Sequence, residues 1–250
     1  MIGLLLLGVT AYFVSLYATN TEQPEFTIRQ IQTIRSYNTD KETEHVVHVD
    51  AFRKDGASFT SETFSTNGKT ASVAALQLPD QHSRIVMQPE TAMKSTYPVS
   101  DQQVAGWKAP MPSDCSPIIG ATPSQLVGTF SMYGVAVQRF VTDGPVATTE
   151  TNMAPTLRCF AVRIMTKWRD PAGRYTSETV KDTVELKLGP PEPALFNVPN
   201  ELVETTPSVA RNATHEYLHG VGSVPTVECW LKVNNKLDAR YTSAQALRRP

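Results

Sequence analysis

Apolar and polar residues alternate with a period of two along much of this chain, and turn dipeptides interrupt the alternation repeatedly. The runs VGTFSMYGVAVQRFVT, LRCFAVRIMTKW and YTSETVKDTVELKL alternate as half-buried strands do. Asp55-Gly56 and Asn67-Gly68 are dipeptides that favour tight hairpin turns. About six to nine short strands joined by such turns predict a mainly β protein, built on one curved antiparallel sheet with a few short helices.

Shorter segments add to this prediction. Strand-like runs are expected at four further places, residues 26–31, 46–49, 84–87 and 93–97. Two segments favour helices instead, residues 71–78 and residues 208–219. The Pro-rich stretch 101–123 holds Trp107 and Cys115. It predicts a long loop that is functional or covers the core.

Composition excludes several classes of protein. The 250 residues suffice for one large domain or two small ones, each with a real core. With 40% hydrophobic and 19% charged residues, the chain is neither a disordered tail nor a coiled coil nor collagen-like. The formal net charge is −1, from 23 Lys and Arg against 24 Asp and Glu. We therefore expect no nucleic-acid partner.

The N-terminal segment predicts the compartment. Residues 1–18, MIGLLLLGVTAYFVSLYA, carry no charge and are just long enough to cross a hydrocarbon core of about 30 Å as a helix. We expect a transmembrane anchor or a signal peptide, although the basic residue that normally opens a signal peptide is missing. A buried core helix is the alternative. Residues 19–25 then form a tether, and the protein belongs to the bacterial cell envelope, anchored in the membrane or exported.

Cysteine usage agrees with an exported protein. The chain has three cysteines, Cys115, Cys159 and Cys229, and their spacings match no metal-binding or redox CxxC pattern. In an oxidising compartment two of them can pair, and Cys115 with Cys159 is the disulfide candidate. Three separate buried thiols are the alternative.

Histidine and tryptophan residues are weaker candidates for a site. His45 and His48 fall on opposite faces of a strand, so we expect them to face solvent and core respectively rather than share a ligand. Trp107, Trp168 and Trp230 either line an apolar groove or belong to the core.

One motif carries chemistry. His215-Glu216-Tyr217-Leu218-His219 matches the H-E-x-x-H pattern, which places two imidazoles on one helix face as ligands for Zn²⁺. Glu216 then sits where it can deprotonate a metal-bound water. The third ligand would be Asp238 or Glu228. The alternatives are a non-catalytic metal site and a polar surface helix.

A proline-rich segment near the C-terminus carries a family resemblance. Asp170-Pro171 is followed by the run LGPPEPALFNVP, residues 188–199. This pattern resembles the closing module of exported proteins from acidobacteria-like bacteria. A similar ending recurs in proteins similar to the outer-membrane lipoprotein carriers and their receptor. Pro190 and Leu202 depart from the pattern, which usually has an acidic residue or Lys at the first position and Tyr at the second.

The resemblance implies a half-open antiparallel barrel around a helical lid, with a concave apolar groove that holds an acyl chain or a similar ligand. It covers residues 26–208 and leaves 209–250 as a helical or irregular tail. Independently of the family, Leu195, Phe196 and Val198 are apolar plugs among prolines that block further strand pairing. This segment therefore predicts a strap that pins the last edge of the sheet.

Three functional hypotheses follow from these patterns. The first is a non-enzymatic envelope protein without a cofactor, which binds a lipid or another apolar ligand and contacts the membrane through its N-terminal helix. The second is an envelope zinc metallopeptidase that uses residues 215–219. The third is a purely structural envelope module whose groove is filled.

Overall fold

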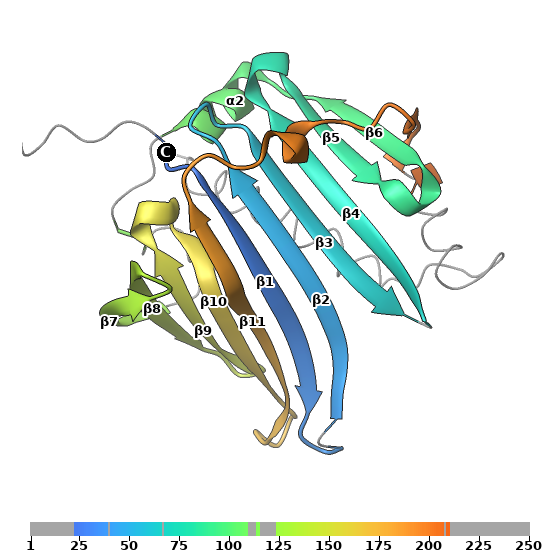
Figure 1. Cartoon of the computed structure of the whole chain (residues 1–250). Helices are drawn as coiled ribbons and strands as arrows, with labels where there is room; N and C mark the ends of the chain where they lie inside the picture. The colour runs from blue at the N-terminus through green and yellow to red at the C-terminus, as the bar shows by residue number, and fades with distance from the viewer. Residues whose placement is uncertain are drawn as a thin grey trace, which may run out of the picture.

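The computed structural model describes residues 23–39, 41–66, 68–109, 114–115, 124–207 and 209–210. Twelve strands form one sheet in the order β12-β6-β5-β4-β3-β2-β1-β11-β10-β9-β8-β7 (Figure 1). The strands are β1 (Phe26–Ser36), β2 (Lys41–Phe52), β3 (Ser58–Thr66), β4 (Lys69–Leu78), β5 (Ser83–Gln88), β6 (Met93–Pro98), β7 (Ser124–Met132), β8 (Val135–Asp143), β9 (Ala147–Ala154), β10 (Phe160–Arg169), β11 (Tyr175–Leu188) and β12 (Val203–Glu204). Neighbouring strands pair antiparallel, except that β12 runs parallel to β6.

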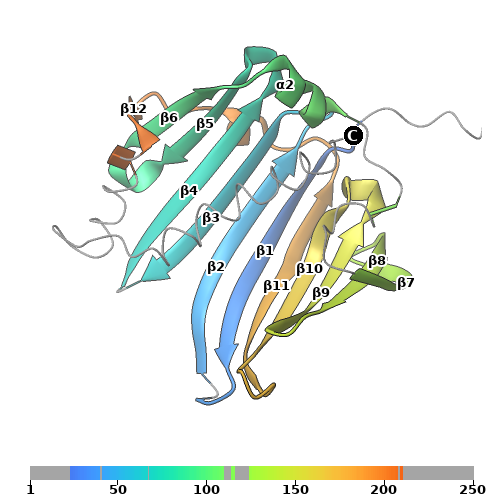
Figure 2. The same ribbon diagram turned by 180° about the vertical axis from the view of Figure 1, so that it is seen from behind.

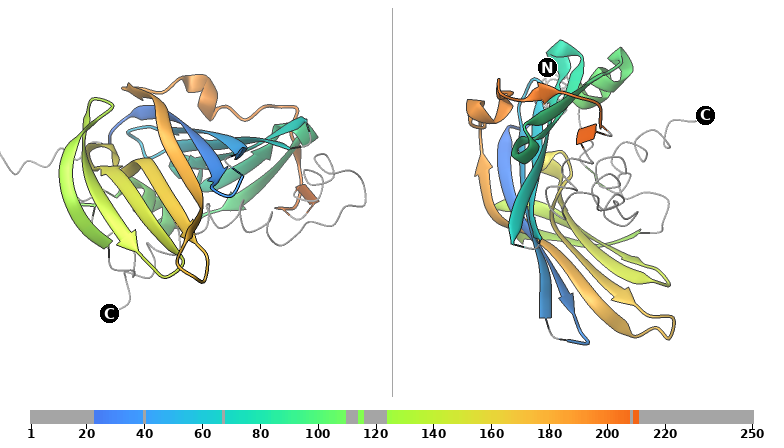
Figure 3. Two further views of the ribbon diagram at one scale, coloured as in Figure 1. Left: turned by 90° about the horizontal axis from the view of Figure 1, so that it is seen from below. Right: turned by 90° about the vertical axis from the view of Figure 1, so that its right-hand side faces the viewer.

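The sheet is curved and open. Strands β7 to β10 bend away to one side of the sheet, which therefore has a convex and a concave face (Figure 3). The two end strands, β12 and β7, do not pair with each other, so the sheet does not close into a barrel. The expectation of a mainly β, curved antiparallel sheet is confirmed, whereas the count of six to nine strands was too low.

Two long strands at the centre carry much of the core. β1 and β11 pair over the whole length of β1, from Phe26 opposite Leu188 to Ser36 opposite Ser177. Phe26 and Ile28 are fully buried. Phe26 stacks on Phe52 with 4.7 Å between ring centroids. It meets Phe160 edge-on at 5.9 Å. This aromatic cluster, packed with Val137, Leu157 and Val162 among others, fills one end of the sheet.

Residues 71–78 form most of β4 rather than the expected helix. Ala71, Val73 and Ala75 lie on one face of this strand, and Ala74 and Leu76 lie on the other. All five are buried, so apolar side chains follow one another without alternation. A strand buried on both faces cannot be distinguished from a helix by periodicity alone, which explains the wrong prediction.

The stretch 101–123, expected to be a loop, begins with a helix. α2 spans Asp101–Lys108 and starts with a reciprocal capping box. The Gln103 backbone N–H donates to the Ser100 hydroxyl, and the Ser100 N–H donates to the Gln103 side-chain oxygen at 2.9 Å. This Ser-x-x-Gln pattern is a sequence signature of a helix N-terminus. The helix buries Val104 and Trp107.

Three connections share one design, in which a proline opens a short 3-10 turn. They are η1 (Pro79–Gln81), η2 (Pro89–Thr91) and η4 (Pro155–Leu157), and they join β4 to β5, β5 to β6 and β9 to β10. Each turn ends in a left-handed residue: His82 (φ 46°), Ala92 (φ 53°) and Arg158 (φ 59°). The prolines supply the fixed φ of the turn and end the preceding strand.

The expected hairpin at Asp55-Gly56 is present between β2 and β3. Gly56 has φ 85°, and a Cβ there would lie 3.1 Å from the Lys108 side chain. Glycine is therefore required both by the backbone conformation and by the close approach of α2. The Ala57 N–H donates to the Asp55 carboxylate at 2.9 Å and closes the turn.

The apolar segment 1–18 and the tail 211–250 lie outside the described residues. In the ranges that the structure does describe, there is no helix with both the length and the apolar character needed to span a membrane. The membrane anchor or signal peptide therefore stays a prediction, as do the boundaries of the tether and the tail.

Candidate functional site

The strap predicted from the sequence crosses the convex face of the sheet. We use the name strap for residues 189–202, which follow β11 and contain η5 (Pro193–Phe196). Figure 1 shows this segment running in front of the upper parts of β2 to β5. Its apolar side chains Phe196, Val198 and Leu202 pack on a cluster from β4 and β5 that consists of Ala74, Leu76, Ile85 and Met87. Phe196 and Val198 thus act as the apolar plugs that the sequence predicts.

The residues directly after the strap, β12 and Thr205, pair with the edge of the sheet. Thr96 of β6 donates from its backbone N–H and from its hydroxyl to the two carboxylate oxygens of Glu204, at 2.6 and 3.0 Å. The Val203 N–H donates to the Ala92 carbonyl at 2.9 Å. The Ser95 hydroxyl donates to the Thr205 carbonyl at 2.9 Å. These bonds cover an otherwise exposed strand edge, which is a common protection of sheet proteins against edge pairing.

A groove of about 300 Å³ lies between the strap and the sheet. Its walls come from β3, β4 and β5 on one side and from the strap on the other. They consist of Phe59, Ser61, Thr63, Ser72, Ala74, Met87, Pro89, Ala194, Leu195, Asn197, Pro199 and Leu202. We call this space the strap groove. Its volume lies at the lower end of the range of small-molecule sites.

The lining of the strap groove is mainly apolar and carries no ionisable group. Its lining side chains are apolar, hydroxyl or amide groups, and none of them is a carboxylate, imidazole, thiol or amine. The hydroxyls of Thr63 and Ser72 lie 3.0 Å apart and hydrogen-bond each other. Such walls bind by apolar contact, with a few hydroxyls and an amide at hand for a polar group.

The opposite, concave face is polar at its centre. Three polar side chains are buried there. Gln30 of β1 (0% exposed) lies opposite His48 of β2 (2%), and Asp50 of β2 (4%) lies on the same face two residues further along. His48 Nδ1 lies 3.2 Å from Glu62 Oε1 on β3. The Gln30 amide donates to the Ala161 carbonyl at 2.9 Å. Figure 2 shows the sheet from this side. Buried apolar residues flank the polar centre on the same face, Phe26 and Ile28 on β1 and Ala71, Val73 and Ala75 on β4. An apolar groove in the concavity therefore stays a prediction, whereas the strap groove lies on the other face.

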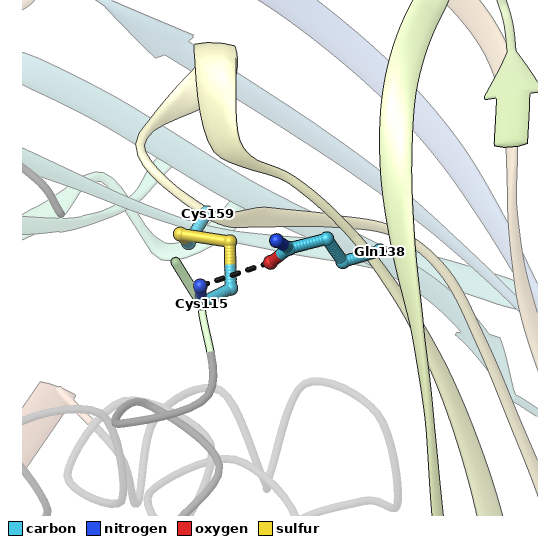
Figure 4. The surroundings of a disulfide bond; sticks show 3 residues. All are labelled: Cys115, Gln138 and Cys159. Carbon is cyan, nitrogen blue, oxygen red and sulfur yellow. Dashed lines mark hydrogen bonds between the residues drawn. A yellow bond between two sulfur atoms is a disulfide. The ribbon is translucent and has the colours of Figure 1, made fainter. Parts of the chain in front are cut away.

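The structure joins Cys115 to Cys159 in a disulfide, with 5.4 Å between their Cα atoms (Figure 4). The bond ties residue 115, upstream of β7, to the turn between β9 and β10. The Cys115 N–H donates to the Gln138 side-chain oxygen at 3.0 Å. Phe140 and Met153 pack around the two sulfurs in a buried cluster. Cys229 lies outside the described residues.

The turn beside the disulfide holds a partly buried arginine. Arg158 and Cys159 both have positive φ, 59° and 52°. The Arg158 guanidinium donates to the Trp107 carbonyl at 2.6 Å. It also lies over the ring of Phe52, 5.5 Å from the centroid. Burial lowers the pKa of Arg158 because desolvation disfavours the charged form. The disulfide therefore anchors a strained turn that also contacts α2.

The other residues singled out from the sequence are dispersed. His45 is exposed and His48 is buried, as predicted from the strand alternation. Trp107 is a buried residue of α2, while Trp168 on β10 is 45% exposed, and neither lines the strap groove. Trp230 lies outside the described residues.

The H-E-x-x-H motif also lies outside the described residues, together with both proposed third ligands. His215, Glu216, His219, Glu228 and Asp238 therefore remain a prediction from the sequence alone. Within the described part of the chain, no group of three or more His, Cys, Asp or Glu residues is placed to hold a metal ion.

The zinc alternative predicts about one zinc ion per purified full-length chain, measured by plasma mass spectrometry. His215→Ala should remove this metal because it deletes a ligand. Glu216→Gln is the matched control, since Glu216 is not a ligand in this motif and its substitution should leave the zinc content unchanged. A background level of zinc in the wild-type protein would contradict the alternative.

The residues of β3, β4 and β5 that line the strap groove were not predicted from the sequence. Leu195 of the strap was recognised as an apolar plug, but Phe59, Ala74 and Met87 carried no signal of their own. Their alternation indicates a buried face without indicating which segment covers it. Only the path of the strap after β11 brings it over these strands.

Comparison with known proteins finds no protein-family model and no curated protein that matches this chain. Solved structures similar to it include the Pseudomonas aeruginosa MucA/MucB complex, at 13% identity and a TM-score of 0.41. That similarity covers 78% of this chain and 63% of the other, so the chain spans less than two thirds of that relative.

Two further similar structures come from proteins named for lipoprotein sorting or its superfamily. One is a LolA superfamily protein from Nitrosomonas europaea, at 12% identity and a TM-score of 0.34, covering 70% of this chain and 91% of that one. The other is an outer membrane lipoprotein-sorting protein domain from Vibrio parahaemolyticus, at 6% and 0.29, covering 75% and 94%. Because these TM-scores are below 0.5, the function of this chain must be argued from its own residues.

Proposed function

We propose that this protein is a non-enzymatic protein of the bacterial cell envelope that binds a small apolar ligand, such as part of an acyl chain, in the strap groove. The observation that carries the proposal is the groove itself, with apolar walls from two distant parts of the chain and no ionisable side chain in its lining. Phe59 and Met87 form one wall, and Leu195 and Leu202 form the other.

The energetics of such a site favour an alkyl ligand. Each buried methylene contributes about 0.8 kcal/mol to binding. The ligand also loses translational and rotational freedom, so several methylenes must fit closely against the walls for net binding. A charged headgroup finds no counter-charge among the lining residues and is expected to stay in solvent outside the groove.

Two features support an envelope location. The Cys115–Cys159 disulfide is typical of an oxidising compartment such as the periplasm. Residues 1–18 are apolar and uncharged, as expected for a membrane anchor or a signal peptide. Together they support a location near a membrane, which is a source of acyl chains.

Ser61→Trp tests the proposal by filling the strap groove. Ser61 lines the groove on β3 opposite Ala74, so an indole there should occupy the ligand's space. We expect the dissociation constant for a fluorescent fatty acid, measured by fluorescence titration, to rise at least about tenfold, which corresponds to about 1.4 kcal/mol.

Ser65→Trp is the matched control, because Ser65 lies on the same face of β3, is exposed and does not line the groove. This variant should bind as the wild type does, and thermal melts of both variants verify folding. Equal affinity of the two tryptophan variants, or no saturable binding to the wild type, would reject the strap groove as the binding site. The third hypothesis, a filled groove with a structural role, would then be favoured.

A further inference from the structure

The two edges of the open sheet differ in how they are covered. At one end, β12 pairs with β6 and Glu204 caps the edge, as described above. At the other end, β7 pairs with β8 and has no other partner strand among the described residues. All its residues except the first and the last are exposed. A strand of this length at an edge presents a row of backbone N–H and C=O groups to any strand that approaches.

The composition of β7 lacks the usual protection against edge pairing. Its sequence, SQLVGTFSM, contains neither a charged residue nor a proline. Leu126, Val127 and Phe130 are 47%, 54% and 40% exposed. Natural edge strands are normally short, or carry lysine, proline or inward charges. A β-bulge can also protect an edge, and the register of β7 does shift between Leu126 and Gly128. This shift leaves residues 128–132 in regular pairing with β8.

The strand is also held firmly in position. The Tyr133 hydroxyl, in the turn between β7 and β8, donates to the Asp182 carboxylate on β11. Burial and this hydrogen bond raise the pKa of Tyr133 to about 12, so the hydroxyl remains a donor even near pH 10, where an ordinary tyrosine is half ionised. An ordered edge loses little conformational freedom when a partner strand docks on it.

We propose that β7 is an interaction surface for a second copy of this chain, which pairs with it antiparallel across a two-fold axis. An antiparallel pair of identical strands is self-complementary and closes as a dimer. Because β7 is uncharged, two copies approach without the like-charge repulsion that most edges would impose. In the register centred on Phe130, the two Phe130 side chains face each other, and Thr129 of each copy lies opposite Ser131 of the other. A single strand contact belongs to the small interfaces, so the dimer is reversible.

Cysteine cross-linking of the full-length chain tests this pairing. In a Cys229→Ser background, Phe130→Cys places a thiol on the proposed axis, and mild oxidation should convert most of the protein to a disulfide-linked dimer on a non-reducing gel. Ala136→Cys is the matched control, since Ala136 is exposed but lies on β8, one strand in from the edge. It should cross-link at least about tenfold more slowly. No dimer from Phe130→Cys, or equal rates for both variants, would overturn the proposal.

A measurement without cysteine substitutions supplies a second readout. Sedimentation equilibrium of the full chain in detergent should show a concentration-dependent dimer for the wild type. Phe130→Lys should raise its dissociation constant at least about tenfold, because two like charges then meet at the axis. Val146→Lys, at an exposed turn residue outside β7, should leave it unchanged. A monomeric wild type, as expected if β7 binds an extended peptide of another protein instead, would overturn the proposal, and so would a dimer that persists in Phe130→Lys.

Discussion

Replacing Cys115 and Cys159 by serine is expected to lower the free energy of unfolding by about 4 kcal/mol. The disulfide closes a loop across 44 residues of sequence, and without it the unfolded chain gains the corresponding conformational freedom. The loss should be large for this fold in particular. The bond secures the left-handed turn at Arg158 and Cys159, and it ties this turn to residue 115, upstream of β7.

The measurement is equilibrium unfolding in urea, followed by tryptophan fluorescence with and without reductant. Reductant should destabilise the wild type by about the same amount as the double substitution, and it should have no effect on the double variant. A wild type that unfolds at the same urea concentration in both conditions would show that this disulfide does not stabilise the sheet.

Phe26→Ala is expected to lower the free energy of unfolding by about 3–5 kcal/mol. Phe26 is fully buried at the start of β1, stacked on Phe52 and in edge contact with Phe160. Removing its ring leaves a cavity among strands that are far apart in the sequence, and the neighbouring backbone is held by pairing on both sides. Such a site relaxes little, so the loss should lie toward the upper part of the range.

Leu188→Ala is the matched control for this substitution. Leu188 lies directly opposite Phe26 on β11, but its side chain is 64% exposed. Its removal should change the free energy of unfolding by less than about 0.5 kcal/mol. Similar losses for the two variants in urea unfolding would mean that this end of the sheet is not packed as the structure describes.

The strands of this protein could be predicted where one face is buried and the other is exposed. The segment 175–188, with its alternating YTSETVKDTVELKL, was predicted as a strand and is β11. Residues 147–154, ATTETNMA, were not predicted, because β9 is mostly polar and its hydroxyl side chains are only half-buried. Residues 71–78 failed for the opposite reason, since a strand buried on both faces has no polar side.

The strap groove was predictable in part. The run LGPPEPALFNVP indicated a segment that packs apolar side chains without joining the sheet as a regular strand, and Phe196 and Val198 do pack in this way. The wall of the strap groove opposite them was not predictable. The half-buried Phe59 and the buried Met87 read as ordinary strand residues, and their place in a groove depends on a strap that arrives more than a hundred residues later.

Local patterns of residues were enough to predict the kind of structure: antiparallel strands, their turns, a disulfide candidate and an apolar strap. These follow from local properties, because side-chain alternation, proline and glycine act on the backbone within a few residues. Three features follow only from the folded arrangement: the face of the sheet that the strap covers, the two cysteines that meet, and the open edge at β7. Those outcomes depend on the order of twelve strands, and long-range pairing is set by the total apolar area that the whole chain can bury rather than by any local pattern.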